Sequence, residues 1–214
     1  MAVNRVKAEQ PFTVVIGNPP YKEKAKGLGG WVEDRGKHLN APLDDWQPPG
    51  SWGVGAHAKH LRNLYIYFWR WAAWKVFGGD PFRSGTDQTA IDDWTKRKGV
   101  ICFITVAGFL NGPGFQKMRA DLRRDADEIW VIDCTPEGHQ PPQASRVFGG
   151  VQQPVCIVMV SRKANVERDT PARVRFRALP EGSKEDKFAA IAGIGLDDAG
   201  WVEAAFTLPP EATN

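Results

Sequence analysis

The sequence predicts an α/β fold, in which the strands of one sheet alternate with helices that cover its faces. Four short apolar runs rich in β-branched residues have the composition of buried strands, and they lie at residues 13–16, 99–106, 128–133 and 154–160. Two segments between these runs have apolar side chains at helical spacing, namely residues 61–77 and 113–124. Ligands of α/β sheets bind at the carboxyl ends of the strands, so we expect a functional site at such an end.

The remaining segments are more polar. Residues 61–77 are apolar nearly all round, which predicts a mostly buried helix. Residues 78–98 are expected to be a polar connection. After about Ser161 the composition becomes charged. There, the alternation at residues 173–177 predicts an edge strand, and residues 184–194 predict a short helix.

Length and composition limit the class of protein. The chain has 214 residues, a hydrophobic content of 42% and a net charge of +3, which fits one α/β domain and is compatible with nucleic-acid contact. The N-terminus has no hydrophobic signal core, and the longest apolar run, residues 100–110, is too short to span a bilayer. The three cysteines have no paired spacing and predict small core residues in a reducing compartment: Cys102, Cys134 and Cys156. We therefore expect a cytoplasmic protein without a membrane partner.

The four residues Asn18-Pro19-Pro20-Tyr21 follow the first predicted strand directly and form the strongest candidate site. The two prolines stiffen the backbone and bias the residues before them toward extended geometry. Because proline has no N–H, the turn offers an amide side chain and bare carbonyls, which is an excess of hydrogen-bond acceptors beside an aromatic ring. A packed proline turn is the alternative interpretation of the tetrapeptide, and the strand before it favours a site.

Such a turn suits a flat ring that carries an exocyclic amine, and adenine fits this description. The Asn18 side-chain oxygen and the Pro19 carbonyl would accept the two N–H bonds while Tyr21 stacks on the ring. The lone pair of this amine is delocalised into the ring. Two acceptors in a tetrahedral arrangement favour the localised lone pair that attack on a methyl group needs, which stabilises the transition state.

With this motif the chain resembles the amino-methylating DNA methyltransferases, whose catalytic motif is Asp/Asn/Ser-Pro-Pro-Tyr/Phe at a strand end. The Asn-Pro-Pro-Tyr form is similar to the adenine-N6 branch, and the chain looks closest to the methylase part of single-polypeptide restriction or phage-defence enzymes. The resemblance covers residues 11–162 and is highly specific only at residues 18–21. It implies a Rossmann-like fold, DNA as the partner and S-adenosylmethionine as the methyl donor.

Residues 146–155, Arg-Val-Phe-Gly-Gly-Val-Gln-Gln-Pro-Val, resemble the late motif of this family, in which an aromatic residue packs on the flipped base before a hairpin strand. The match makes Phe148 the second candidate stacking residue, opposite Tyr21. An ordinary hydrophobic loop anchor is the alternative interpretation of Phe148. The resemblance thus implies that Asn18 and Pro19 orient the amine, that Pro20 shapes the turn, and that the two rings enclose the base.

The chain departs from the family at the cofactor site. Family members place a glycine-rich loop and an acidic ribose-binding residue before the catalytic turn, whereas the first strand is expected here as early as residue 13. The glycines at residues 27–30 follow the turn without a preceding strand, and we interpret them as loop flexibility. We therefore expect the C-terminal half of a methyltransferase sheet whose first strands are missing, with no identifiable cofactor-binding residues and with a complementing chain as a candidate partner.

Other motifs are weak. His57 and His60 lack a third ligand at metal spacing, so no metal site is expected. We divide the chain into a catalytic half-domain at residues 1–162 and a polar tail at residues 163–214, which is a candidate start of a target-recognition region. Two functions stay open. One is a site-specific DNA adenine-N6 methyltransferase that is inactive as this chain alone, and the other is a non-catalytic nucleic-acid-binding or assembly module that lost the cofactor half.

Overall fold

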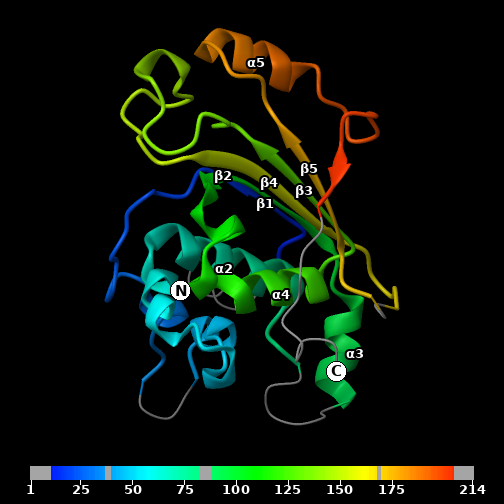
Figure 1. Cartoon of the computed structure of the whole chain (residues 1–214). Coiled ribbons are helices and arrows are strands. Elements are labelled where there is room, and N and C mark those ends of the chain that lie inside the picture. The colour runs from blue at the N-terminus through cyan, green and yellow to red at the C-terminus, as the bar shows by residue number, and fades with distance from the viewer. Residues whose placement is uncertain (1–10, 37–39, 82–87, 168–169, 205–214) are drawn as a thin grey trace, which may run out of the picture.

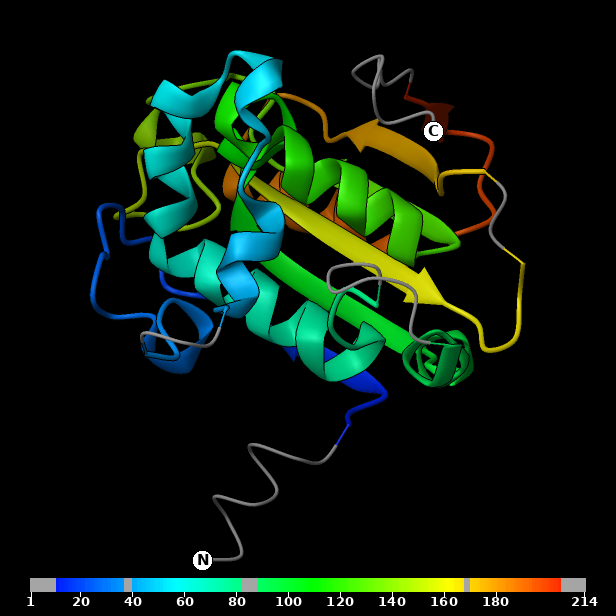
Figure 2. The same ribbon diagram turned by 90° about the horizontal axis from the view of Figure 1, so that it is seen from below.

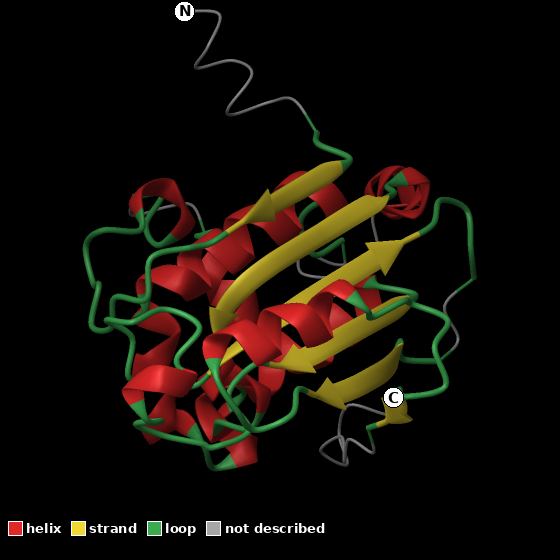
Figure 3. Cartoon of the chain, turned by 90° about the horizontal axis from the view of Figure 1, so that it is seen from above, coloured by secondary structure: helices red, strands yellow, loops and turns green. Residues whose placement is uncertain are grey.

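The computed structural model describes residues 11–36, 40–81, 88–167 and 170–204. This part of the chain forms one mixed six-stranded sheet in the order β1-β2-β4-β3-β5-β6. The strands are β1 (Val14–Gly17), β2 (Gly99–Val106), β3 (Glu128–Asp133), β4 (Val155–Arg162), β5 (Arg173–Ala178) and β6 (Val202–Glu203). β1 runs parallel to β2, and β3 runs parallel to β5, whereas β4 is antiparallel to both of its neighbours, β2 and β3. β1 and β6 form the two edges of the sheet (Figure 3).

Helices cover both faces of the sheet. α2 (Leu64–Phe77) and α4 (Gln116–Asp125) lie on one face, and α5 (Lys184–Ala192) lies on the other (Figure 1). The view from below shows α2 and α4 running along the strands, with part of the sheet visible between them (Figure 2). Short 3₁₀ helices complete the structure at Gly30–Val32, Pro42–Trp46, Gly50–Trp52, Gly55–Arg62, Ala107–Leu110, Pro113–Phe115 and Gln143–Ser145. Among the helices of the described residues, none has the length and apolar character needed to cross a bilayer.

The predicted α/β class is confirmed, and β2 and β3 have the predicted bounds. The other predicted strands and helices differ from the observed ones at their ends, and three of the differences are larger. The α-helix expected from residue 61 begins at Leu64, after a 3₁₀ segment. The polar connection contains a helix, α3 (Gln88–Lys96). β5 is no edge strand, because β6 pairs with its outer side and is itself the edge of the same sheet.

The core lies between the sheet and α2. Trp69 of α2 is fully buried, and its ring centroid lies 4.9 Å from that of Phe103 on β2, edge to face. Such aromatic pairs contribute about 1 kcal/mol beyond their area burial. The helix ends at Phe77, where Gly78 has a φ of 95° and its N–H donates to the Trp74 carbonyl, a backbone geometry that glycine adopts readily.

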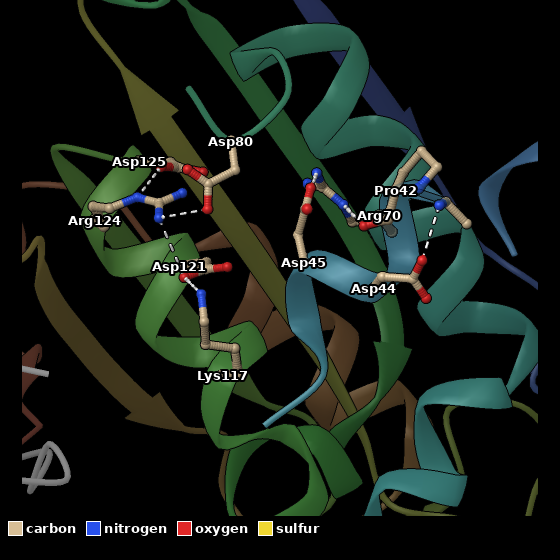
Figure 4. A network of polar contacts seen from close by, with 10 residues as sticks. Pro42, Asp44, Asp45, Arg70, Asp80, Lys117, Asp121, Arg124 and Asp125 are labelled. Atoms are coloured by element: carbon tan, nitrogen blue, oxygen red, sulfur yellow. Dashed lines mark hydrogen bonds and ion pairs between the residues drawn. The ribbon is translucent and has the colours of Figure 1, made fainter. Parts of the chain in front are cut away.

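Charged side chains fix the outer segments to this core (Figure 4). Arg70 of α2 is buried, donates from Nε to the Pro42 carbonyl at 2.7 Å and pairs with the buried Asp45. Its guanidinium also lies 5.3 Å from the ring centroid of Trp46. These contacts hold the 3₁₀ helix Pro42–Trp46 on α2, and breaking a buried pair of this kind costs about 3–5 kcal/mol.

A second cluster surrounds α4, where Asp121 pairs with Lys117 and Arg124 (Figure 4). Desolvation raises the pKa of the buried Asp121 to about 6, although Arg124 and Lys117 lower it. The unfolded chain releases this proton near its ordinary pKa of 3.8. The folded state therefore loses stability relative to the unfolded state as the pH rises between these two values.

Replacement Asp121→Asn removes this titration. Relative to the wild type, the variant should gain up to about 3 kcal/mol in free energy of unfolding between about pH 4 and about pH 6.5. Urea denaturation across this range measures the difference. Asp93→Asn, on the exposed surface of α3, is the matched control and should show no such trend. Parallel stability curves for wild type and Asp121→Asn would contradict the prediction.

Candidate functional site

Strand β1 positions the Asn18 turn at the end of the sheet that contains the carboxyl ends of β1 and β2. Its β-branched residues pair in register with β2 from Val14 opposite Val100 to Gly17 opposite Phe103. The chain then leaves the sheet, with Asn18 exposed and Pro19 buried beneath it. The turn is therefore anchored through a proline ring, and its amide side chain faces solvent.

Tyr21 is the next anchor. Its ring is half-buried, and its hydroxyl donates to the Ile104 carbonyl of β2 at 3.4 Å. Burial raises the pKa of Tyr21 well above its usual range, with smaller contributions from Cys156 and Cys134. The phenol therefore stays neutral at physiological pH and acts as a fixed aromatic surface at this edge.

The structure brings Phe148 to Tyr21, although the two residues are far apart in sequence. Phe148 lies on the loop from β3 to β4, which lies at the same end of the sheet as the carboxyl end of β1. The two ring centroids are 6.1 Å apart, and the ring planes are inclined by 60°. The rings thus contact each other directly. A base stacked between them would require Phe148 to turn parallel to Tyr21 and move outward.

The loop that carries Phe148 is held at its base. The Thr135 hydroxyl accepts a hydrogen bond from the Val155 N–H at 3.0 Å, and the Cys134 N–H donates to the Val155 carbonyl at 3.0 Å. Side chains of the α5 region pack on the same apolar cluster as Tyr21 and Phe148: Ala190, Ile191 and Ile194. The sequence assigned these residues to a polar tail, so their place beside the candidate site was missed.

An apolar groove of about 420 Å³ runs from Asn18 along the open side of β1. Its walls come from β1, from Phe68 and Trp71 of α2 and from Phe103, and Asn18 is the only amide or charged side chain in the lining. Ribose hydroxyls of a bound nucleoside cofactor are usually held by a carboxylate. This groove therefore does not by itself provide the donor and acceptor set that S-adenosylmethionine needs.

The glycine-rich segment does not supply a cofactor loop either. The amides of Gly27 and Gly29 donate to one carboxylate oxygen of Glu33, at 2.7 and 3.2 Å. Glu33 also pairs with Arg62 at 3.4 Å. The N–H groups that an anionic cofactor group such as a carboxylate would use already have an anionic partner within the chain.

The cysteines are free thiols without an evident chemical role. Cys134 and Cys156 are buried and Cys102 is partly buried. Desolvation raises the pKa of Cys134 to about 12, so its thiol stays protonated. Across the described ranges, no group of three or more His, Cys, Asp or Glu residues is arranged to hold a metal ion.

Comparisons with known proteins identify solved structures with a similar fold. No protein-family model matches the sequence, and no curated protein sequence matches it. Several solved structures resemble it. One is the ATP-dependent Type ISP restriction-modification enzyme LlaBIII bound to DNA, with a TM-score of 0.55 and 20% identity over 88% of this chain and 11% of the other. Another is the DrdV–DNA complex, with a TM-score of 0.57 and 18% identity over 94% of this chain and 18% of the other. A further one is a nuclease-deletion mutant of the Type ISP restriction-modification enzyme LlaGI with a DNA substrate mimic, with a TM-score of 0.59 and 16% identity over 99% of this chain and 16% of the other.

At these identities the likeness shows a shared fold. The chain therefore has a fold found in restriction-modification enzymes, and it spans less than a fifth of the length of these three structures.

The contact between the two rings can be measured as a coupling energy. A double-mutant cycle of Tyr21→Ala and Phe148→Ala should give an interaction of about 0.5–1.5 kcal/mol, as for other aromatic pairs. Guanidinium denaturation of the four proteins provides the values. Phe188→Ala, on the exposed side of α5, replaces Phe148→Ala in the control cycle and should show no coupling with Tyr21. A coupling near zero for Phe148 as well would show that the rings are apart in solution.

Proposed function

We propose that this chain is the base-binding part of a DNA adenine-N6 methyltransferase from a restriction-modification or phage-defence system. The observation that carries the proposal is the Asn18-Pro19-Pro20-Tyr21 turn at the carboxyl end of β1, with Phe148 in contact with the Tyr21 ring. The fold shared with restriction-modification enzymes, whose structures contain DNA or a DNA mimic, supports DNA as the substrate.

Each residue of the turn has a chemical task in this proposal. The exposed Asn18 amide oxygen and the Pro19 carbonyl accept the two N–H bonds of a flipped adenine amine, and the buried Pro19 ring keeps the acceptors in place. Pro20 directs the chain toward Tyr21. The neutral Tyr21 ring, held through its hydroxyl on β2, provides a stacking surface that extrusion of a base requires.

S-adenosylmethionine would supply the methyl group when bound. The groove beside Asn18 lacks a ribose-binding carboxylate, so a complementing chain or segment would have to hold the cofactor. Among the residues that the structure describes, β1 pairs with a strand on one side only, and its Val14 and Ile16 side chains are 57% and 76% exposed. An apolar open edge of this kind pairs readily with another strand. We propose that the complementing part docks here.

The apolar lining of the groove also favours the second candidate. A DNA-binding or assembly module without catalytic activity would keep the base pocket and would need no cofactor residues. Calorimetric titration with S-adenosylmethionine, in the presence of any complementing chain, separates the two functions because only the enzyme must bind it.

In a completed enzyme, Asn18→Ala should lower the rate of methyl transfer by about 100-fold to 1000-fold, because the lost acceptor acts on the transition state. Binding of duplex DNA should remain nearly unchanged. Transfer of a tritiated methyl group to DNA measures the rate, and a gel-shift titration measures the affinity. Asn111→Ala, another exposed asparagine at this edge of the sheet, is the control. A rate within a few-fold of the wild type would remove Asn18 from the mechanism.

The isolated 214-residue chain should bind S-adenosylmethionine no more tightly than about 1 mM, which corresponds to only ~4 kcal/mol. It should also self-associate through β1, because the open apolar edge is unprotected. Ile16→Lys should reduce this association in sedimentation velocity, whereas Val202→Lys, on the opposite edge strand β6, should not. Methylation of adenine in DNA by the purified monomer would overturn the proposed division of labour.

A further inference from the structure

Lys187 of α5 is fully buried, which is unusual because lysine side chains nearly always keep their ammonium group in water. Its ammonium group has three N–H donors, and each has a partner. They donate to the Cys134 carbonyl at 3.1 Å, to the Ser145 carbonyl at 2.9 Å and to the Glu137 carboxylate at 2.7 Å. Such complete pairing is what a buried charge needs to be tolerated.

The three acceptors all belong to the loop from β3 to β4. Cys134 is the first residue after β3, and Ser145 lies three residues before Phe148. One side chain therefore connects the start of the loop, its middle and α5. Desolvation raises the pKa of Glu137, but the hydrogen bond and charge of Lys187 together with backbone N–H groups outweigh it and lower this pKa, so the carboxylate stays charged at neutral pH.

Apolar contacts continue this connection to the candidate site. Val147, next to Phe148, is buried in the small cluster that also contains Cys134, Val155 and Leu179. Ile191, one turn along α5 from Lys187, packs on this cluster, as do Tyr21 and Phe148. One face of α5 thus makes both kinds of contact, since residues four apart lie on the same side of a helix. Lys187 anchors this face to the loop backbone, and Ile191 packs against the residues that support the two rings.

We propose that Lys187 is a positioning residue of the base pocket, which holds the backbone of the loop that carries Phe148 beside Tyr21, through the carbonyl groups of Cys134 and Ser145. Its role toward DNA rests on the proposed function, whereas the placement of the ring does not. A site works only when its supporting residues fix its geometry, because a displacement of about 1 Å can cost about 100-fold in rate. Lys187 supplies this support from a segment outside the residues that carry the family resemblance.

The test compares Lys187→Met with Lys184→Met in the full chain. Both changes remove an ammonium group from α5, but only Lys187 is fully buried and contacts the loop. The first measurement is the nuclear Overhauser effect between labelled Phe148 and Tyr21 rings, without DNA. It should disappear in Lys187→Met, while amide exchange in β2 and β4 stays slow. Lys184→Met should retain both properties.

The second measurement uses DNA with 2-aminopurine in a mismatch, where extrusion costs least. Retention of the extruded base, followed by its fluorescence, should be about tenfold weaker in Lys187→Met, which corresponds to the loss of one stacking contact. Lys184→Met should behave like the wild type.

If Lys187→Met does not fold, Lys187→Gln replaces it, because the shorter amide keeps N–H donors and only weakens the connection. A ring contact that persists in folded Lys187→Met, or that is as strong in Lys187→Gln as in the wild type, would overturn the positioning role. Loss of the ring contact, with no extrusion even by the wild type, would support the positioning role and overturn the proposed function.

Discussion

The parallel pairing of β1 with β2 is the constraint on which the candidate site depends. It sets the point where the chain leaves the sheet, and so places Asn18 beside the carboxyl end of β2. The entry to β2 requires glycine, because Gly99 has a φ of 151° and a Cβ there would lie 2.2 Å from the Thr13 carbonyl oxygen. That close approach lets the Val100 N–H donate to the same carbonyl at 2.8 Å and fixes the register of β1.

The second constraint is the return of β4 between β2 and β3. Because β4 is antiparallel to both, its amino end lies beside the carboxyl ends of β2 and β3. The loop before β4 must therefore pass over the Asn18 turn, and this topology brings Phe148 to Tyr21. α5 then covers the loop from the other face of the sheet. The site is thus made by the Asn18 turn, the loop from β3 to β4 and α5. These three segments are distant in sequence and meet at the end of the sheet where β1, β2 and β3 end (Figure 3).

Much of the fold could be predicted because buried strands have a simple signature. β2 and β3 are apolar runs rich in β-branched residues, with alternate residues buried, and their bounds match the predicted runs. α3 was missed because none of its residues is buried, so its polar sequence resembles a loop. The insertion of β4 and the pairing of β5 on both sides depend on tertiary contacts that periodicity does not encode. Lys187 gives no sequence signal, since a lysine in a charged helix normally predicts a solvated surface.

The Asn18 turn was predicted from its residues and strand context, and Phe148 from the resemblance to a family motif. The structure adds the contact between the rings and the open side of β1. The central claim is that this turn holds a flipped adenine, and a structure with duplex DNA containing a mismatched adenine tests it most directly. The account predicts the adenine outside the helix, its amine within hydrogen-bond distance of Asn18 Oδ1 and the Pro19 carbonyl. An adenine that stays stacked in the duplex, or DNA bound away from this edge of the sheet, would contradict it.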